Sequence, residues 1–257
     1  MAYVDLPGVK LWYTDSGGDG VPIVLLHAAS GTSDCWEQQL PAFTGAGYRC
    51  VAYDRRGWGK SEPKPSTGEQ PGIASDDLHA LIEHLGLDRV HLVGTAAGAA
   101  PAMDYAFSHP ERLRSLTVAD CTGGVKEKAY LELHERMRPP EFQALPTVLR
   151  EVSPNYRGLN PEGTKRWLEI EHASNHEDAP RQGQRNTITY ALLETLKVPV
   201  LAIAGQADQS TPPALMRQFV AHIPGCRYET VPEAGHAAFW EQPEIWNKLV
   251  LDFIQQH

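Results

Sequence analysis

The sequence predicts an α/β fold in which a mostly parallel central sheet is flanked by helices, with a helical cap inserted between two strands. Three observations lead to this prediction. Short apolar runs bounded by turn residues alternate with longer helical patterns along the chain. A length of 257 residues with 42% apolar content suits one large domain. One long segment, 122–196, contains no strand-like run.

The apolar runs are predicted strands because each is short and is bounded by turn residues. They cover residues 11–14, 23–26, 50–53, 90–93, 113–118, 198–204 and 228–231. Other segments carry apolar residues at helical spacing, and the predicted helices are 35–46, 73–85, 97–108, 213–222 and 243–256. Alternation of this kind is typical of βαβ units, whose strands run parallel.

The segment 122–196 interrupts this alternation. Its helical or irregular pieces are 130–137, 146–152, 164–173 and 187–196. A structureless connection of this length is uncommon inside a compact domain, so the segment is interpreted as a helical cap. The predicted organisation is therefore a core made of residues 1–121 and 197–257, with residues 122–196 as an inserted cap.

Composition and charge exclude several classes of function. A formal net charge of -9 without clustered Lys and Arg argues against nucleic-acid binding. Neither a secretory leader nor an apolar run of membrane-spanning length occurs, so we expect a cytoplasmic protein without a membrane partner. The four cysteines lie far apart, which favours buried free thiols in a reducing compartment. No metal-ligand spacing or cofactor-binding glycine motif occurs, so no metal or cofactor is expected.

A turn of small residues follows the predicted strand at 90–93. Its sequence is Gly94-Thr95-Ala96-Ala97-Gly98, and it leads into a predicted helix. Strand, sharp turn and helix form the setting of the nucleophile elbow G-x-S-x-G, in which the central side chain stands above the sheet. Alone, the turn is equally consistent with an ordinary small-residue loop. Its central residue is Ala96, whose methyl group cannot attack a carbonyl.

Further motifs at matching positions support the elbow interpretation. They are His27-Ala28-Ala29-Ser30 after the run 23–26, Asp-Arg-Arg-Gly-Trp-Gly-Lys-Ser at 54–61, Gly205-Gln206-Ala207-Asp208 after the run 198–204, and Ala234-Gly235-His236 after the run 228–231. With these motifs the chain resembles the α/β-hydrolase superfamily, in its capped branch of esterases, lactonases and cofactor-free haloperoxidases. The resemblance extends from residue 11 to residue 254 and is weakest in the cap. It departs from the family pattern at Ala96, where a serine is expected, and more mildly at Ala28, where these proteins often carry glycine.

The resemblance implies roles for a histidine and an acid. His236 is the expected general base, and Asp208 the acid that holds its tautomer and stabilises the imidazolium. Asp120 is the alternative acid, because it ends the strand before the cap and some relatives place the acid there. The expected oxyanion-hole donors are the backbone N–H groups of Ala29 and Ala97.

Pocket walls are expected from the cap and from loops near the triad. The substrate-binding candidates are Trp36, Trp58, Met137, Tyr156, Trp167, Tyr190 and Phe239. For each of them, packing in the core is an alternative of at least equal weight.

Three interpretations of Ala96 remain open. The chain is a hydrolase of a carboxylic ester or lactone that works through a Ser-Asp-His triad, here in a serine-to-alanine form that binds substrate without turnover. Alternatively, it is a non-catalytic ligand-binding or sensor protein. It could also be a cofactor-independent enzyme of dioxygenase or lyase type that uses the His-Asp pair alone. The expected partner is a small ester, thioester or lactone of apolar character, and the oligomeric state is not predicted.

Overall fold

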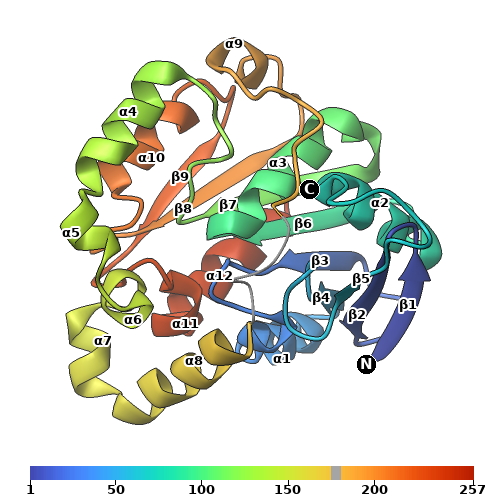
Figure 1. Cartoon of the computed structure of the whole chain (residues 1–257), viewed down its shortest axis with the longest axis horizontal. Coiled ribbons are helices and arrows are strands. Elements are labelled where there is room, and N and C mark those ends of the chain that lie inside the picture. The colour runs from blue at the N-terminus through green and yellow to red at the C-terminus, as the bar shows by residue number, and fades with distance from the viewer. Residues whose placement is uncertain (175–180) are drawn as a thin grey trace.

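The computed structural model describes residues 1–174 and 181–257 and contains a mixed, mostly parallel sheet (Figure 1). The strand order is β1-β2-β4-β3-β6-β7-β8-β9, and β5 pairs with β2. The strands are β1 (Ala2–Leu6), β2 (Val9–Asp15), β3 (Pro22–Leu26), β4 (Arg49–Tyr53), β5 (Glu62–Pro63), β6 (Val90–Thr95), β7 (Leu113–Ala119), β8 (Val200–Gly205) and β9 (Arg227–Val231). From β4 to β9 along this order, neighbouring strands are parallel, whereas β2 is antiparallel to both β1 and β4.

The predicted strands are all confirmed, and the sequence analysis missed β1 and β5. In β1 only Val4 and Leu6 are buried, so the strand shows no apolar run. It pairs with β2 through a tight turn at Gly8, whose φ of 77° is in the left-handed region that glycine tolerates. In β5 both residues are exposed. Edge strands with so little buried surface leave almost no hydrophobic signal.

Helices cover both faces of the sheet, as expected. The core helices are α1 (Gln39–Gly45), α2 (Ala74–His84), α3 (Ala99–Ser108), α10 (Pro213–Val220), α11 (Ala238–Glu241) and α12 (Pro243–Ile254). The first predicted helix, 35–46, begins too early in the sequence analysis. Ser33–Trp36 is instead a separate 3-10 turn, with the side chain of Thr32 accepting a hydrogen bond from the N–H of Asp34.

Alternation along β3 divides the hydrophobic core into two layers. Val24 and Leu26 belong to one buried cluster with residues of α2, α3 and α10. Ile23 and Leu25 belong to a second cluster with residues of α1, α11 and α12. Because successive side chains of a strand point to opposite faces, a fully apolar strand must be covered on both sides.

Between β7 and β8 the described chain leaves the sheet and forms short helices. They are α4 (Lys128–Met137), α5 (Pro140–Gln143), α6 (Thr147–Glu151), α7 (Pro154–Leu159), α8 (Pro161–Ala173) and α9 (Tyr190–Leu193). The predicted pieces correspond to α4, α6, α8 and α9, although α9 is shorter than the predicted 187–196. The sequence analysis missed α5 and α7, each of which begins with a proline in its first turn. In Figure 1, α4 to α8 pass along one side of the sheet.

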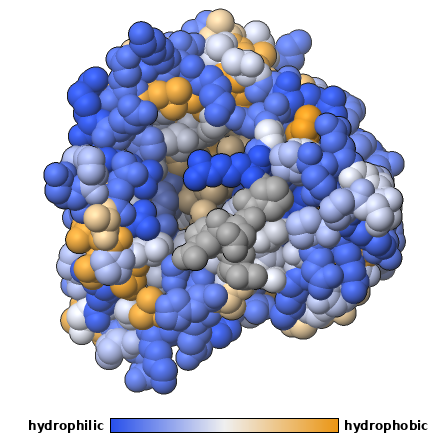
Figure 2. All heavy atoms as spheres, in the orientation of Figure 1, coloured by the Kyte–Doolittle hydropathy of each residue, from blue (hydrophilic) through white to orange (hydrophobic). Residues whose placement is uncertain are grey.

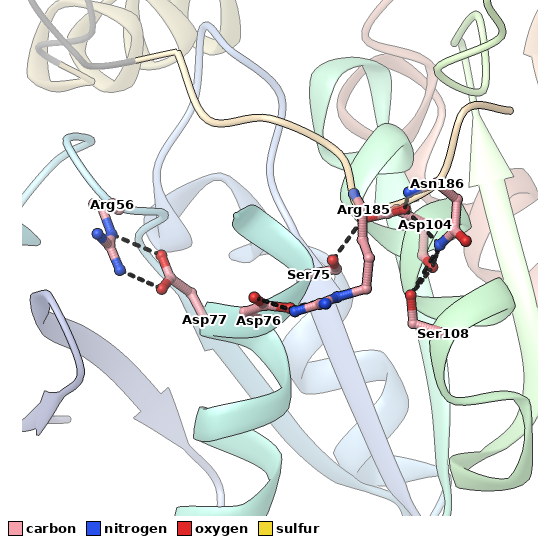
Figure 3. Close-up of polar contacts among 8 residues, drawn as sticks. All are labelled: Arg56, Ser75, Asp76, Asp77, Asp104, Ser108, Arg185 and Asn186. Carbon is pink, nitrogen blue, oxygen red and sulfur yellow. Dashed lines mark hydrogen bonds and ion pairs between the residues drawn. The ribbon is translucent and has the colours of Figure 1, made fainter. Parts of the chain in front are cut away.

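Residues 181–189 lead the chain from the cap back to the core, and we call this segment the return strap. Three aspartates of α2 and α3 hold it, and Figure 3 shows the contacts that two of them, Asp76 and Asp104, make with it. Buried Asp104 accepts hydrogen bonds from the N–H groups of Arg185 at 2.9 Å and Asn186 at 2.8 Å. Asp76 pairs with the Arg185 guanidinium at 2.6 Å. Asp77 accepts from the side-chain amide of Gln182 at 2.8 Å. The strap is therefore fastened to the helix that follows the elbow.

The longest helix in the described part of the chain is α8, with 13 residues. A membrane-spanning helix needs about 20 predominantly apolar residues. None of the described helices is both long enough and apolar enough to cross a bilayer.

Candidate active site

The turn after β6 has the conformation of a nucleophile elbow. Ala96 has a φ of 47°, in the left-handed region that costs a non-glycine residue on the order of 1–2 kcal/mol. The two flanking glycines permit this turn. A Cβ on Gly94 would stand 2.6 Å from the carbonyl oxygen of Gly98, and a Cβ on Gly98 would stand 2.6 Å from that of His27. The tight turn is therefore maintained although its central side chain is only a methyl group.

An aspartate and a histidine from two successive loops form a buried pair. Asp208 follows β8 and His236 follows β9. The Nδ1 atom of His236 lies 2.8 Å from Oδ2 of Asp208. The other carboxylate oxygen, Oδ1, accepts the backbone N–H groups of Ser210 at 2.7 Å and Thr211 at 2.8 Å. These bonds fix the carboxylate, which in turn orients the imidazole.

The environment of this pair favours the charged form of the histidine. Burial acts to lower the pKa of His236, but the charge and the hydrogen bond of Asp208 outweigh it. Glu151 and Asp120 add to the same effect, and the pKa rises to about 9. The surrounding carboxylates therefore stabilise the protonated imidazole.

Asp120, the alternative acid, lies at the end of β7 and is fully buried. Its φ of 48° is in the left-handed region. One carboxyl oxygen accepts the N–H of Gly205 at 2.6 Å, and the other has no hydrogen-bond partner among the described residues. Burial and the nearby charge of Asp208 raise the pKa of Asp120 well above its usual range. The structure therefore brings Asp208, not Asp120, into hydrogen-bond contact with His236.

A cavity of about 300 Å³ opens between the elbow and the cap helices α4 and α6. Figure 2 shows a hollow on this face of the molecule, with a paler floor and a largely hydrophilic rim. The lining residues come from the elbow, the loop after β3, the end of β7, the two cap helices and the loops after β8 and β9. They are Ala29, Ser30, Ala96, Ala97, Ala100, Asp120, Cys121, Thr122, His134, Arg138, Thr147, Arg150, Glu151, Ser210, Thr211 and His236. Ala96 and Ala97 of the elbow, Ala29 of the loop after β3, and the expected base His236 thus line one cavity.

Comparison with known proteins places the chain in a family. Residues 23–249 match the alpha/beta hydrolase family. The chain belongs to this family. The chain is 27% identical to a 2-hydroxy-6-oxononadienedioate/2-hydroxy-6-oxononatrienedioate hydrolase from Paraburkholderia phymatum, over 96% of this chain and 92% of the relative.

Two solved structures share the fold of this hydrolase. An esterase from Thermogutta terrifontis superposes with a TM-score of 0.78 at 24% identity, covering 100% of this chain and 99% of the esterase. An enol-lactonase from Burkholderia xenovorans LB400 superposes with a TM-score of 0.77 at 22% identity, covering 99% of this chain and 100% of the lactonase. The predicted α/β-hydrolase fold is therefore confirmed.

The loop that carries Ala29 is braced by the motif at 54–61. The indole N–H of Trp58 donates to the carbonyl of Ala29 at 2.8 Å, and the N–H of Arg55 donates to Nε2 of His27 at 2.9 Å. The carboxylate of Asp54 accepts the N–H of Ser33 at 2.6 Å. These contacts fix the position of the loop beside the elbow, which an oxyanion-hole donor requires.

None of the seven aromatic and Met candidates lines the cavity at the elbow. Trp36 is fully buried against Phe239 and Trp246, and Tyr190 stacks on His222. Met137 and Tyr156 pack against the two core clusters, and Trp58 braces the loop of Ala29. Trp167 and Phe239 line only a small neighbouring hollow that also reaches His236. Large aromatic side chains bury the most area in the core, which is where the hydrolase uses them.

Polar residues of the cap line the cavity where the aromatic and Met candidates were expected. The sequence analysis did not propose Arg138, Arg150, Thr147, Glu151 or His134 as lining residues. One signal was present: His134 and Arg138 are four residues apart, which places the two side chains about one helical turn from each other. The Nη1 atom of Arg138 lies 3.3 Å from Nε2 of His134. No group of three or more potential metal ligands occurs within residues 1–174 and 181–257.

Proposed function

We propose that this protein is a scaffold of a carboxylic-ester or lactone hydrolase that binds its substrate but does not turn it over, because Ala96 occupies the nucleophile position. The observation that carries the proposal is the intact buried pair of His236 and Asp208 beside an elbow that keeps its left-handed turn. The family membership and the hydrolase activity named for the relative from Paraburkholderia phymatum support it.

The remaining groups are suited to hold a carbonyl. In this proposal a substrate oxygen accepts the N–H groups of Ala29 and Ala97 at about 2.7–3.1 Å, and its carbon lies over the methyl of Ala96. With a serine at position 96, His236 would take the hydroxyl proton and later return it to the leaving group. Asp208 would hold the tautomer that this transfer needs. No metal or organic cofactor takes part in these steps.

The direct test is the substitution Ala96→Ser. We expect the variant to hydrolyse short-chain p-nitrophenyl esters, while the chain as it stands shows little or no enzymatic rate, because nucleophile loss costs roughly 10⁶-fold in turnover in well-studied triads. Since His236 has a pKa of about 9 and must be unprotonated to act as a base, the rate of the variant should rise as the pH approaches that value.

Ala96→Gly is the matched control, since glycine also accepts the left-handed turn but adds no hydroxyl. Mass spectrometry of the serine variant with a slow ester should detect an acyl group on residue 96. Equal rates for the serine and glycine variants would refute the assignment of position 96 as the nucleophile site.

A second candidate is a cofactor-independent enzyme that uses the pair of His236 and Asp208 alone. One observation favours it: the pair is complete although position 96 holds a methyl group. Such an enzyme would abstract a proton from an enolisable substrate. In deuterated buffer, the chain as it stands would then exchange the α-protons of an enolisable aryl ketone, and His236→Ala would abolish this. Absence of exchange above pH 9 would refute this second candidate.

Two further parts of the proposal concern organisation and location. We propose the division into a core of residues 1–121 and 197–257 and a cap of residues 122–196, because the described cap helices all lie between β7 and β8. We also propose a cytoplasmic location, supported by four unpaired cysteines. The proposed partner is a small-molecule ester or lactone.

A further inference from the structure

The cavity holds two cationic side chains that the chemistry at the elbow does not use. We propose that Arg138 and Arg150 form an anion subsite, which selects esters or lactones that carry a carboxylate at the end remote from the reacting carbonyl. This inference rests on the proposed function for the carbonyl end of the ligand. It assigns the cap helices the role of recognising charge.

The two arginines come from different cap helices and converge on one cavity. Arg138 directly follows α4, Arg150 lies in α6, and both line the hollow that contains Ala96 and His236. Neither guanidinium forms an ion pair with a carboxylate of the described residues. Both side chains are only partly exposed, so water hydrates the two guanidinium groups incompletely.

Some N–H groups of each guanidinium already contact the protein, and the remaining N–H groups are available to a ligand. Arg150 donates through Nε to the carbonyl of Leu145 at 3.0 Å and through Nη2 to the hydroxyl of Thr147 at 3.2 Å. Arg138 contacts His134, and its buried Nε has no hydrogen-bond partner within the described chain. A guanidinium has five N–H donors in a planar fork that matches a carboxylate. A ligand carboxylate would satisfy donors that the protein leaves unpaired.

The charges around the cavity favour an anion on the cap side. Burial lowers the pKa of Arg138, and the positive charge of Arg150 lowers it further, so the two cations repel each other. The charges of Glu151 and Asp208 act in the opposite direction on Arg138. The Glu151 carboxylate accepts the hydroxyl of Ser30, towards the loop of Ala29, and forms no ion pair with either arginine within the described residues. The charge of His236 is already balanced by Asp208 at 2.8 Å. The two arginines therefore carry charge that no ion pair within the described residues neutralises.

An anionic ligand differs from the apolar one expected from the sequence. A partly buried cation without a partner is costly, and a bound carboxylate would offset that cost. A neutral ester of the same length would leave both guanidinium groups without a carboxylate partner. The subsite thus discriminates by charge, while the elbow recognises the carbonyl.

The experiment uses two p-nitrophenyl esters with the Ala96→Ser variant: mono-p-nitrophenyl glutarate, which carries a free carboxylate, and its methyl ester, which is neutral. Arg138→Gln and Arg150→Gln are each added to the variant. We expect each change to lower kcat/KM for the anionic ester roughly tenfold to a hundredfold and to leave the neutral ester within about twofold. Arg136→Gln is the matched control, because this exposed arginine of α4 does not line the cavity.

A binding measurement separates this inference from the proposed function. Calorimetry with glutarate and the chain as it stands should detect binding that weakens by a similar factor in Arg138→Gln and not in Arg136→Gln. If the serine variant hydrolyses neither ester, the proposed function fails, and the calorimetry still decides on the subsite. Equal losses for both esters, or glutarate binding that is indifferent to Arg138 and Arg150, would overturn the subsite.

Discussion

The return strap and the cavity use the same types of charged residue in opposite ways. At the base of the strap, Arg56 and Asp77 form a buried ion pair at 2.5 Å, and Arg185 pairs with Asp76 (Figure 3). In the cavity, Arg138 has no carboxylate partner among the described residues. A paired buried cation holds the chain in place, whereas an unpaired one beside a hollow is available to a ligand.

Carboxylates in the two regions differ in the same manner. Asp104, under the strap, accepts hydrogen bonds through both oxygens, including one from the hydroxyl of Ser75 at 2.5 Å. Asp120, at the cavity, has one oxygen bonded to Gly205 and the other without a partner in the described structure. The chain itself saturates the carboxylate of Asp104, whereas Asp120 keeps one unpaired acceptor beside the cavity.

The largest expected effect concerns the acids of the cavity. In the Ala96→Ser variant, Asp208→Asn should lower kcat by about 10⁴-fold, because asparagine stabilises the wrong tautomer of His236 and cannot balance its charge. Asp120→Asn should have a much smaller effect, since Asp120 is not hydrogen-bonded to the histidine. Steady-state kinetics of both variants on one ester measures the difference. A larger loss for Asp120→Asn would reverse the assignment of the acid.

A large effect on stability is expected at the base of the strap. Asp77→Asn would leave the Arg56 guanidinium buried without a charged partner, and breaking a buried pair in this way costs about 3–5 kcal/mol. Urea denaturation should show this as a lower midpoint. Arg138→Gln provides the comparison, because it removes a cation that has no partner, and its free energy of unfolding should fall by less than about 1 kcal/mol. Similar losses in both variants would contradict the distinction between the two regions.

The smallest effect is expected where an ion pair of the strap faces solvent. The side chains of Arg185 and Asp76 are 53% and 43% exposed. Arg185→Gln should change the free energy of unfolding by no more than about 1 kcal/mol, because exposed pairs are screened by water and salt. The backbone N–H of residue 185 would still donate to Asp104. Thermal denaturation at low and high salt tests this, and a loss comparable to that of Asp77→Asn would show that the strap depends on its outer pair.

The sequence predicted the sheet and the elbow because their signals are local. Buried parallel strands are continuous apolar runs, and the turn at Ala96 needs its two glycines at fixed positions. The contact between His236 and Asp208 could be expected only through the resemblance to the family, because the two residues are far apart in the chain.

The cap side of the cavity was not predictable in this way. Arg138 and Arg150 lie on separate short helices, and nothing in their spacing indicates that the fold brings both to one hollow. Trp36 and Phe239 were expected at the pocket because they are large and lie near the motifs, but their size is used to fill the core. Pocket walls depend on how the helices pack, which local patterns do not specify.

The turn at Ala96 has a consequence for how this protein can evolve. Its shape depends on the absence of side chains at Gly94 and Gly98, and not on the residue between them. Alanine and serine codons of the GCN and TCN types differ only in their first base. A single nucleotide change can therefore convert a protein that binds substrate into one that turns it over, or the reverse. The backbone of the turn needs no rearrangement for this change.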